Sequence, residues 1–183
     1  AVTASATPMV ESDIITQLQL KDTQVFRQSF ERTNIQYTLA YSEQKNSDVA
    51  TILQEHTGSS IVYCRSRKQT EVLAKQLQAH GINALPYHAG MQNETRTEYH
   101  QLWTKNEVQV MVATTAFGMG IDKPDVRSVI HYDVPEHIEA YYQESGRAGR
   151  DGKDAASVLL YNHQDIYKLE VSTATQFPPY DFI

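Results

Sequence analysis

Cysteine is nearly absent from this sequence of 183 residues. The single example, Cys64, cannot form an intrachain disulfide or a zinc site that needs several thiolates. Long apolar runs are also missing, because no stretch approaches the roughly twenty apolar residues that span a bilayer. The first ten residues, AVTASATPMV, lack the basic and apolar parts of a secretory signal. We therefore expect neither a secreted disulfide scaffold nor a membrane span, and the start suggests a chain that begins inside a longer protein.

Positive charge is scarce as well. The sequence has 16 Lys and Arg against 22 Asp and Glu, which gives a formal net charge of -6. Proteins that hold nucleic acid by bulk electrostatics need many cations to neutralise phosphates. Any contact with DNA must therefore be local, through main-chain N–H groups, hydroxyls and a few arginines.

Motifs for metal binding and for cradling a nucleotide are missing too. None of the seven histidines forms a His-x-x-x-His pair with an intervening acid, so no metal site is expected. His131 falls in an expected strand and is interpreted as a core residue. The sequence has no Gly-x-x-x-x-Gly-Lys-Ser/Thr loop, and no Asp-Glu pair for magnesium and water follows a strand. We therefore expect this chain alone not to hydrolyse ATP.

What the sequence does contain is an alternation of short β-rich runs and helical patterns. The strands are expected at Ile35–Ala40, Ser60–Arg65, Ala84–His88, Val108–Thr114, Val126–Asp133 and Ala156–Tyr161. Helices are expected at Ser47–His56, Arg67–His80, Asn93–Thr104, Glu136–Ala148 and Gln164–Val171, with Val72, Leu73 and Leu77 facing inward. This order predicts a three-layer α/β domain with a mainly parallel sheet of about six strands flanked by helices.

The chain divides into three parts on this pattern. Residues 1–34 stand outside the alternation, although Asp13–Leu20 looks helical and the polar stretch before residue 35 resembles a linker. Residues 35–172 form the α/β domain. Residues 173–183 look like the start of a following segment, because the paired prolines Pro178 and Pro179 interrupt any helix there.

Ligands of parallel α/β sheets gather at the carboxyl ends of the strands, so the loops there are the expected place of function. One segment, residues 141–152, reads YYQESGRAGRDG and places Arg147 and Arg150 three positions apart, a spacing that on a helix puts both residues on one face. Guanidinium groups bind phosphate oxygens bidentately and stay charged at any working pH. The pair is therefore a candidate phosphate site, and a solvated helix end is the plainer alternative.

A second segment, residues 114–122, reads TTAFGMGID. Its hydroxyls follow an expected buried strand, and Gly118 and Gly120 would let the main chain approach a ligand. A dinucleotide-binding fingerprint would need a third glycine at position 123, which is Lys123, so the Rossmann-type interpretation loses most of its support.

These two segments, together with residues 61–67 (IVYCRSR) and 87–91 (YHAGM), resemble four motifs of the C-terminal motor domain of RecQ-family helicases, in the same order. The resemblance implies a RecA-like second motor domain that shares its ATP and Mg²⁺ with a first motor domain. Residues 1–34 resemble the last motif of that first domain and the connection between the two domains. The full-length parent would be an ATP-dependent DNA helicase of DNA repair or recombination, moving 3′ to 5′ on DNA. It would act in the bacterial nucleoid within the cytoplasm, or in a eukaryotic nucleus, and the fragment is expected to be a monomer.

The resemblance also implies roles for individual residues. Arg150 would be the arginine finger and Arg147 its phosphate-binding neighbour, with Gln143, Asp122 and Gly120 completing the ATP-binding set. The DNA-binding set would contact the phosphates of a single strand or fork and comprises Ser66, Arg65, Arg67, His88, Gly90 and Thr114. DNA is favoured over RNA because the last motif differs from the His-Arg-Ile-Gly-Arg type of RNA helicases.

Two alternatives stay open at this point. A self-contained Rossmann-type nucleotide-binding protein would bind a nucleotide tightly without a partner domain. A non-catalytic interaction module would keep the fold without the motor cycle, although it would have no need for a pair of phosphate-binding arginines.

Overall fold

The computed structural model describes residues 7–26, 31–118 and 121–176 of the chain. Two compact units are present, residues 1–33 and residues 34–183. Within the first unit the described part contains one helix, α1 (Pro8–Gln17), whose N-cap Thr7 accepts a hydrogen bond from the N–H of Val10. The helix thus begins and ends a few residues earlier than the expected Asp13–Leu20 helix.

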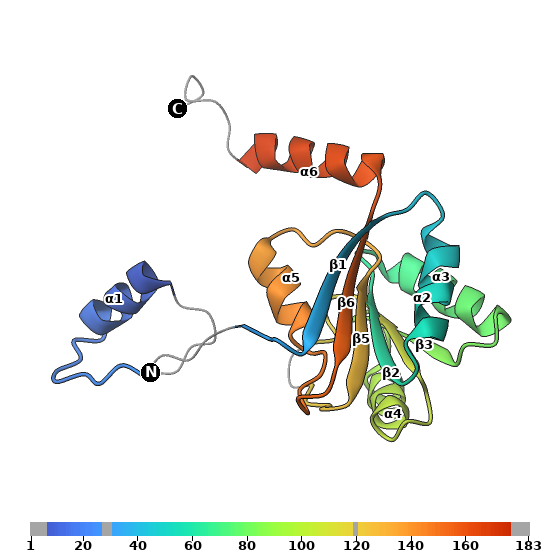
Figure 1. Ribbon diagram of the computed structural model, residues 1–183, viewed down its shortest axis with the longest axis horizontal. Coiled ribbons are helices and arrows are strands. Elements are labelled where there is room, and N and C mark those ends of the chain that lie inside the picture. The colour runs from blue at the N-terminus through green and yellow to red at the C-terminus, as the bar shows by residue number, and fades with distance from the viewer. Residues whose placement is uncertain (1–6, 27–30, 119–120, 177–183) are drawn as a thin grey trace. The chain divides into compact units, whose positions relative to one another are not determined.

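The second unit is built on a six-stranded sheet in which every neighbouring pair is parallel, as predicted (Figure 1). The strands lie in the order β1-β6-β5-β2-β4-β3. Their bounds are β1 (Ile35–Tyr41), β2 (Ser59–Tyr63), β3 (Ala84–Tyr87), β4 (Val110–Ala113), β5 (Val126–His131) and β6 (Ala155–Tyr161). Strands β2 and β4 are buried throughout, which explains why β4 is wholly apolar and why β2 is apolar after its two opening serines.

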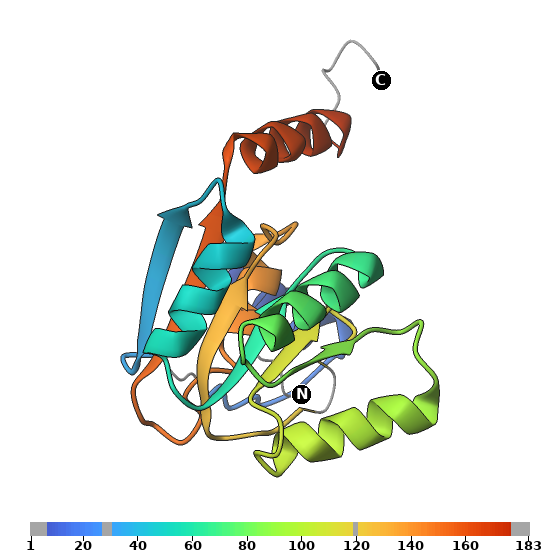
Figure 2. The ribbon, with the colours of Figure 1, turned by 90° about the vertical axis from the view of Figure 1, so that its right-hand side faces the viewer.

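Five helices belong to this unit. They are α2 (Lys45–Glu55), α3 (Arg67–Ala79), α4 (Asn93–Thr104), α5 (Ile138–Ser145) and α6 (His163–Gln176). Helices α2 and α3 lie side by side on one face of the sheet, and α5 lies on the other (Figures 1 and 2). No helix among the described residues is long and apolar enough to cross a membrane.

The two faces of the sheet carry separate apolar clusters because successive side chains of a strand point to opposite sides. On β2, Val62 packs beneath α2 and α3, whereas Ile61 and Tyr63 pack in the second cluster with Trp103 of α4. Helix α3 contributes Leu73 and Leu77 as predicted, but Val72 is 39% exposed and the prediction for it was wrong. The buried positions of α3 are Thr70, Leu73, Ala74 and Leu77, a helical stripe that leaves Val72 to one side.

The connection from β4 to β5 differs from the other crossovers because its described residues contain no helix. It is residues 114–125, which we name the crossover segment. Phe117 and Ile121 are its buried apolar residues, and both pack in the second cluster beside Tyr63 and Ala148. The face of the sheet is therefore covered here by chain that is not helical in its described part, and its main-chain carbonyls lie close to the residues after α5.

Candidate functional site

The carboxyl ends of four strands lie next to one another and place the motif-bearing loops at one edge of the sheet. The N–H of Cys64 donates to the carbonyl of Ala113 (2.8 Å), and the N–H of Thr114 donates to Tyr87 (3.1 Å). On the other side, the N–H of Tyr132 donates to the carbonyl of Tyr63 (2.9 Å). The loops after β2, β3, β4 and β5 therefore leave the sheet as one row.

Ser66 and Arg65 follow β2 in this row. Ser66 is the N-cap of α3, and its Oγ accepts a hydrogen bond from the N–H of Gln69 (3.1 Å), a bond that does not use its own O–H as a donor. Arg65 is held toward the loop after β5, because its N–H donates to Asp133 Oδ2 (2.7 Å) and its Nη2 donates to the carbonyl of Val134 (3.0 Å).

Arg67, His88 and Gly90 form a tight group after β2 and β3. A Cβ atom on Gly90 would lie 3.0 Å from Arg67 Nη1 and 3.3 Å from His88 Nδ1, so a side chain there would require Arg67 to shift by a few tenths of an ångström. His88 is 5% exposed, and its Nε2 lies 3.1 Å from Glu71 Oε1. Within the described residues its buried Nδ1 has no hydrogen-bond partner. The expected set is thus gathered, although His88 offers little surface to a ligand.

Thr114 follows β4 and is half-buried. Its N–H is bonded to the carbonyl of Tyr87, and its own carbonyl accepts the N–H of Phe117 (2.9 Å). A contact with a phosphate would therefore use the hydroxyl of Thr114 rather than its main chain.

The prediction of a helix as far as Ala148 is wrong, and Arg147 and Arg150 lie in a turn instead of sharing a helix face. Helix α5 ends at Ser145, and the chain then turns, with Gly149 in the left-handed region at φ +56°. The turn is bonded to the crossover segment and to the start of β5: Gly149 N–H donates to Val126 (2.9 Å) and Asp151 N–H donates to Pro124 (3.1 Å). These tertiary hydrogen bonds replace those that a longer helix would have made.

Both arginines nevertheless extend to the segment that the sequence paired with them. Arg147 Nη1 donates to the carbonyl of Gly118 (2.7 Å). Arg150 Nη1 donates to the carbonyl of Ile121 (3.0 Å) and to Asp122 Oδ1 (2.9 Å). The side chains of Arg150 and Asp122 are 35% and 85% exposed, so this ion pair lies at the surface. Gln143 is exposed on α5, whereas Gly120 lies outside the described residues.

A buried polar group lies close to Arg147, and the sequence singled out only one of its members, His131. His131 is fully buried, as predicted for a core residue, and its Nε2 lies 3.0 Å from Glu144 Oε2 at the end of α5. The His131 ring stacks on Tyr63, whose hydroxyl donates to the carbonyl of Phe117 (2.8 Å). Burial raises the pKa of Tyr63, and the nearby Arg147 opposes that rise only in part, so the hydroxyl remains a donor.

Asn34 is a site residue that the sequence assigned to the linker. Its Nδ2 donates to the carbonyls of Gly149 and Lys153, both at 2.8 Å, and so closes the turn that carries Arg150. Asn34 and Gly149 are 115 positions apart in the chain, and no local pattern announces such a contact.

A hollow of about 250 Å³ lies at the same edge of the sheet. Its lining includes Arg65 and Asp133 on one side and Glu144 and Ala140 of α5 on the other. The loop that carries the predicted DNA-binding residues and the helix that leads to the arginines therefore border a common space.

Comparison with known proteins supports the helicase resemblance. Residues 44–152 match the family described as helicase conserved C-terminal domain. The RecQ-like DNA helicase BLM of Xenopus laevis is 42% identical over 92% of this chain and 13% of its own length. The ATP-dependent DNA helicase RecQ of Pasteurella multocida is 42% identical over 90% of this chain and 26% of its own length.

The fold has a solved counterpart as well. The structure of Saccharomyces cerevisiae Dbp5 bound to RNA and ADP BeF3 superimposes with a TM-score of 0.74 at 18% identity, over 96% of this chain and 48% of that one. At this identity the likeness concerns the fold alone, which is RecA-like. The chain spans no more than 28% of the length of the first curated relatives it matches. The family match also favours the helicase prediction over the Rossmann-type alternative. The chain belongs to the helicase conserved C-terminal domain family, and the proteins to which it is 42% identical include the RecQ-type helicases named above.

Proposed function

We propose that this chain is the second motor domain of a RecQ-type DNA helicase, whose ATP site is shared with a first motor domain of the same parent protein. One observation carries the proposal: Arg147 and Arg150 are both directed to the crossover segment, where Asp122 is exposed beside them. The sequence has no phosphate-cradling loop of its own, so the phosphates facing these arginines would be held by another domain.

The residues present fit a bound triphosphate. Each guanidinium carries five N–H donors, and the hydrogen bonds described above are made by Nη1 alone, so other donors remain for phosphate oxygens. The Arg150–Asp122 ion pair is largely exposed, and exposed pairs contribute only about 0–1 kcal/mol, so Arg150 can exchange Asp122 for a phosphate at little cost. Asp122 would then be available to a ribose hydroxyl.

In this proposal ATP supplies the phosphoryl group whose transfer to water drives the motor. Arg150 acts as the arginine finger that stabilises negative charge in the transition state, and Arg147 holds a phosphate oxygen. Gln143 couples the nucleotide to the cleft between the two motor domains, and Gly120 is proposed to let the main chain approach the nucleotide. Mg²⁺ is assigned to the first motor domain, and the described residues contain no group of three acids, histidines or cysteines that could hold a metal.

The DNA part of the proposal uses the row of loops that follow β2, β3 and β4. Ser66, Arg67, Gly90 and Thr114 would contact the phosphates of one strand, with Arg65 and His88 behind them. Closure of the cleft on ATP would move this grip relative to the first motor domain, and opening after hydrolysis would release it. The resulting translocation is proposed to run 3′ to 5′, on chromosomal DNA in the nucleoid or the nucleus, with the fragment itself a monomer.

The test joins this chain to its first motor domain and measures ATP hydrolysis stimulated by single-stranded DNA. We expect Arg150→Ala to abolish turnover while the circular dichroism spectrum stays unchanged, and Lys75→Ala on the exposed face of α3 to leave turnover intact. Full turnover in Arg150→Ala would contradict the arginine-finger assignment. An unsubstituted assembly without any DNA-stimulated hydrolysis would favour the non-catalytic interaction module instead.

A second measurement tests the DNA-binding set. Thr114→Val removes the hydroxyl but keeps the shape of the side chain. We expect it to weaken the affinity of the assembled protein for single-stranded DNA more than its affinity for ATP. The reverse order would mean that the loop serves the nucleotide.

A further inference from the structure

The position of the two arginines depends on the stretch of main chain to which their turn is bonded. The turn's N–H groups at Gly149 and Asp151 donate to Val126 and Pro124, and the arginine side chains donate to Gly118 and Ile121. Whatever holds residues 121–126 in place therefore also places Arg147 and Arg150.

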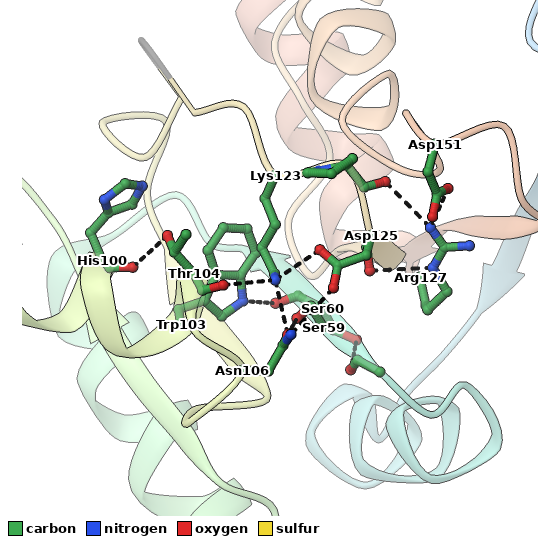
Figure 3. Close-up of polar contacts among 12 residues, drawn as sticks. Ser59, Ser60, His100, Trp103, Thr104, Asn106, Lys123, Asp125, Arg127 and Asp151 are labelled. Carbon is green, nitrogen blue, oxygen red and sulfur yellow. Dashed lines mark hydrogen bonds and ion pairs between the residues drawn. The ribbon is translucent and has the colours of Figure 1, made fainter.

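Lys123 is the residue of this stretch whose buried side chain reaches the end of α4. Its side chain is 4% exposed. Figure 3 shows its Nζ among three oxygens, Asp125 Oδ1 at 2.8 Å, Asn106 Oδ1 at 2.9 Å and the carbonyl of Thr104 at 3.2 Å. The ammonium also lies 5.5 Å from the centre of the Trp103 ring, which is fully buried.

An ammonium group in this place needs a physical reason. Removing a cation from water costs several kcal/mol unless partners replace the lost hydration. Here three oxygens match the three N–H donors of the lysine, and the indole face adds a favourable electrostatic contact. An apolar side chain of similar length would fill the same space without that cost, but it could not bind the end of α4 to residues 121–126.

A second ion pair continues the connection into the turn. Arg127 Nη2 lies 2.6 Å from Asp151 Oδ1, and Arg127 Nη1 donates to the carbonyl of Asp154 (3.0 Å). Lys123 thus joins the end of α4 to the crossover segment, and Arg127 joins the start of β5 to the turn after α5 (Figure 3).

We propose that Lys123 is a positioning residue: by binding the end of α4 to the crossover segment, it sets the place of Arg147 and Arg150. The expected effect of a Lys123 substitution on ATP hydrolysis rests on the proposed function, whereas its expected effect on the main-chain turn after α5 does not. The two are therefore measured separately.

The first experiment uses this chain alone and follows amide hydrogen exchange. In Lys123→Met we expect the amides of Gly149 and Asp151 to exchange about tenfold faster or more, because local opening of the turn becomes easier, while amides of β6 keep their protection. Lys75→Met is the control and should change neither set. Unchanged exchange at Gly149 and Asp151 in a folded Lys123→Met chain would overturn the proposal.

A milder variant guards against loss of the fold. Asn106 has φ +62°, so Asn106→Gly removes one of the three oxygens around the ammonium without backbone strain. We expect the same two amides to exchange faster in this variant, by a smaller factor. Protection of both amides at the level of the unsubstituted chain would again contradict the role of Lys123.

The second experiment uses the chain joined to its first motor domain. We expect Lys123→Met to lower kcat for DNA-stimulated ATP hydrolysis about tenfold, with a smaller change in the KM for ATP, because misplaced arginines fail chiefly in the transition state. Lys123→Arg, which keeps the cation, should recover part of the loss. An equal kcat in both variants and the parent would remove the link to catalysis. No turnover in the parent assembly would contradict the proposed function and leave the exchange result standing.

Discussion

Replacement of Gly149 by alanine tests how tightly the arginine turn is built. The residue has φ +56°, and an added Cβ would lie 2.4 Å from Asn34 Nδ2 and 2.7 Å from the carbonyl oxygen of Lys153. Both atoms belong to the hydrogen bonds by which Asn34 closes the turn. The methyl group therefore cannot enter unless Asn34 leaves and the main chain at Lys153 shifts.

The expected loss of stability follows from these contacts. An alanine in the left-handed region costs about 1–2 kcal/mol. Displacement of Asn34 removes two hydrogen bonds worth about 1 kcal/mol each. We therefore expect Gly149→Ala to lower the free energy of unfolding by about 3–4 kcal/mol.

Gly152 provides the matched control. It has φ +79°, yet an added Cβ would meet nothing within 4 Å, so Gly152→Ala should cost only the backbone strain of about 1–2 kcal/mol. Urea unfolding followed by circular dichroism measures both values by linear extrapolation. In a double-mutant cycle, Asn34→Ala and Gly149→Ala should together cost less than their sum, because each removes the same hydrogen bonds. Equal losses for the two glycine variants would refute the reasoning.

Three further predictions concern the apolar core, the buried thiol of Cys64 and the ion pair between Lys123 and Asp125. Leu73→Ala should lower the free energy of unfolding by about 2–5 kcal/mol, and Val72→Ala beside it by less than about 1 kcal/mol, in the same urea assay. Burial raises the pKa of the Cys64 thiol, so a thiol-specific disulfide reagent at neutral pH should label it only on unfolding, and rapid labelling of the folded chain would contradict this. The hydrogen bond from Lys123 lowers the pKa of Asp125 below its ordinary 3.8, so that carboxylate stabilises the fold above pH 3.8 and ceases to as the pH falls through the lowered pKa. The stability gap between the unsubstituted chain and Asp125→Asn should therefore be wider at pH 7 than at pH 3.

The fold brings together those predicted site residues that directly follow a strand. Ser66, His88 and Thr114 each follow a strand within three residues, and parallel neighbours carry such positions to the same edge. Arg147 and Arg150 contact the segment that the sequence paired with them, but they lie in a turn and not on a helix. Local propensity favours a helix as far as Ala148, whereas hydrogen bonds to Pro124 and Val126 end α5 at Ser145.

By itself the sequence determined the order and type of the elements of the α/β domain and the edge at which its loops meet. Those features follow from apolar periodicity and from the parallel connection of successive strands, and both are local properties of the chain. Only the tertiary structure decided that Asn34 closes the arginine turn and that Lys123 anchors the crossover segment. Asn34 and Lys123 each act through hydrogen bonds to residues distant in sequence. Such contacts produce no periodic pattern in the sequence around either residue.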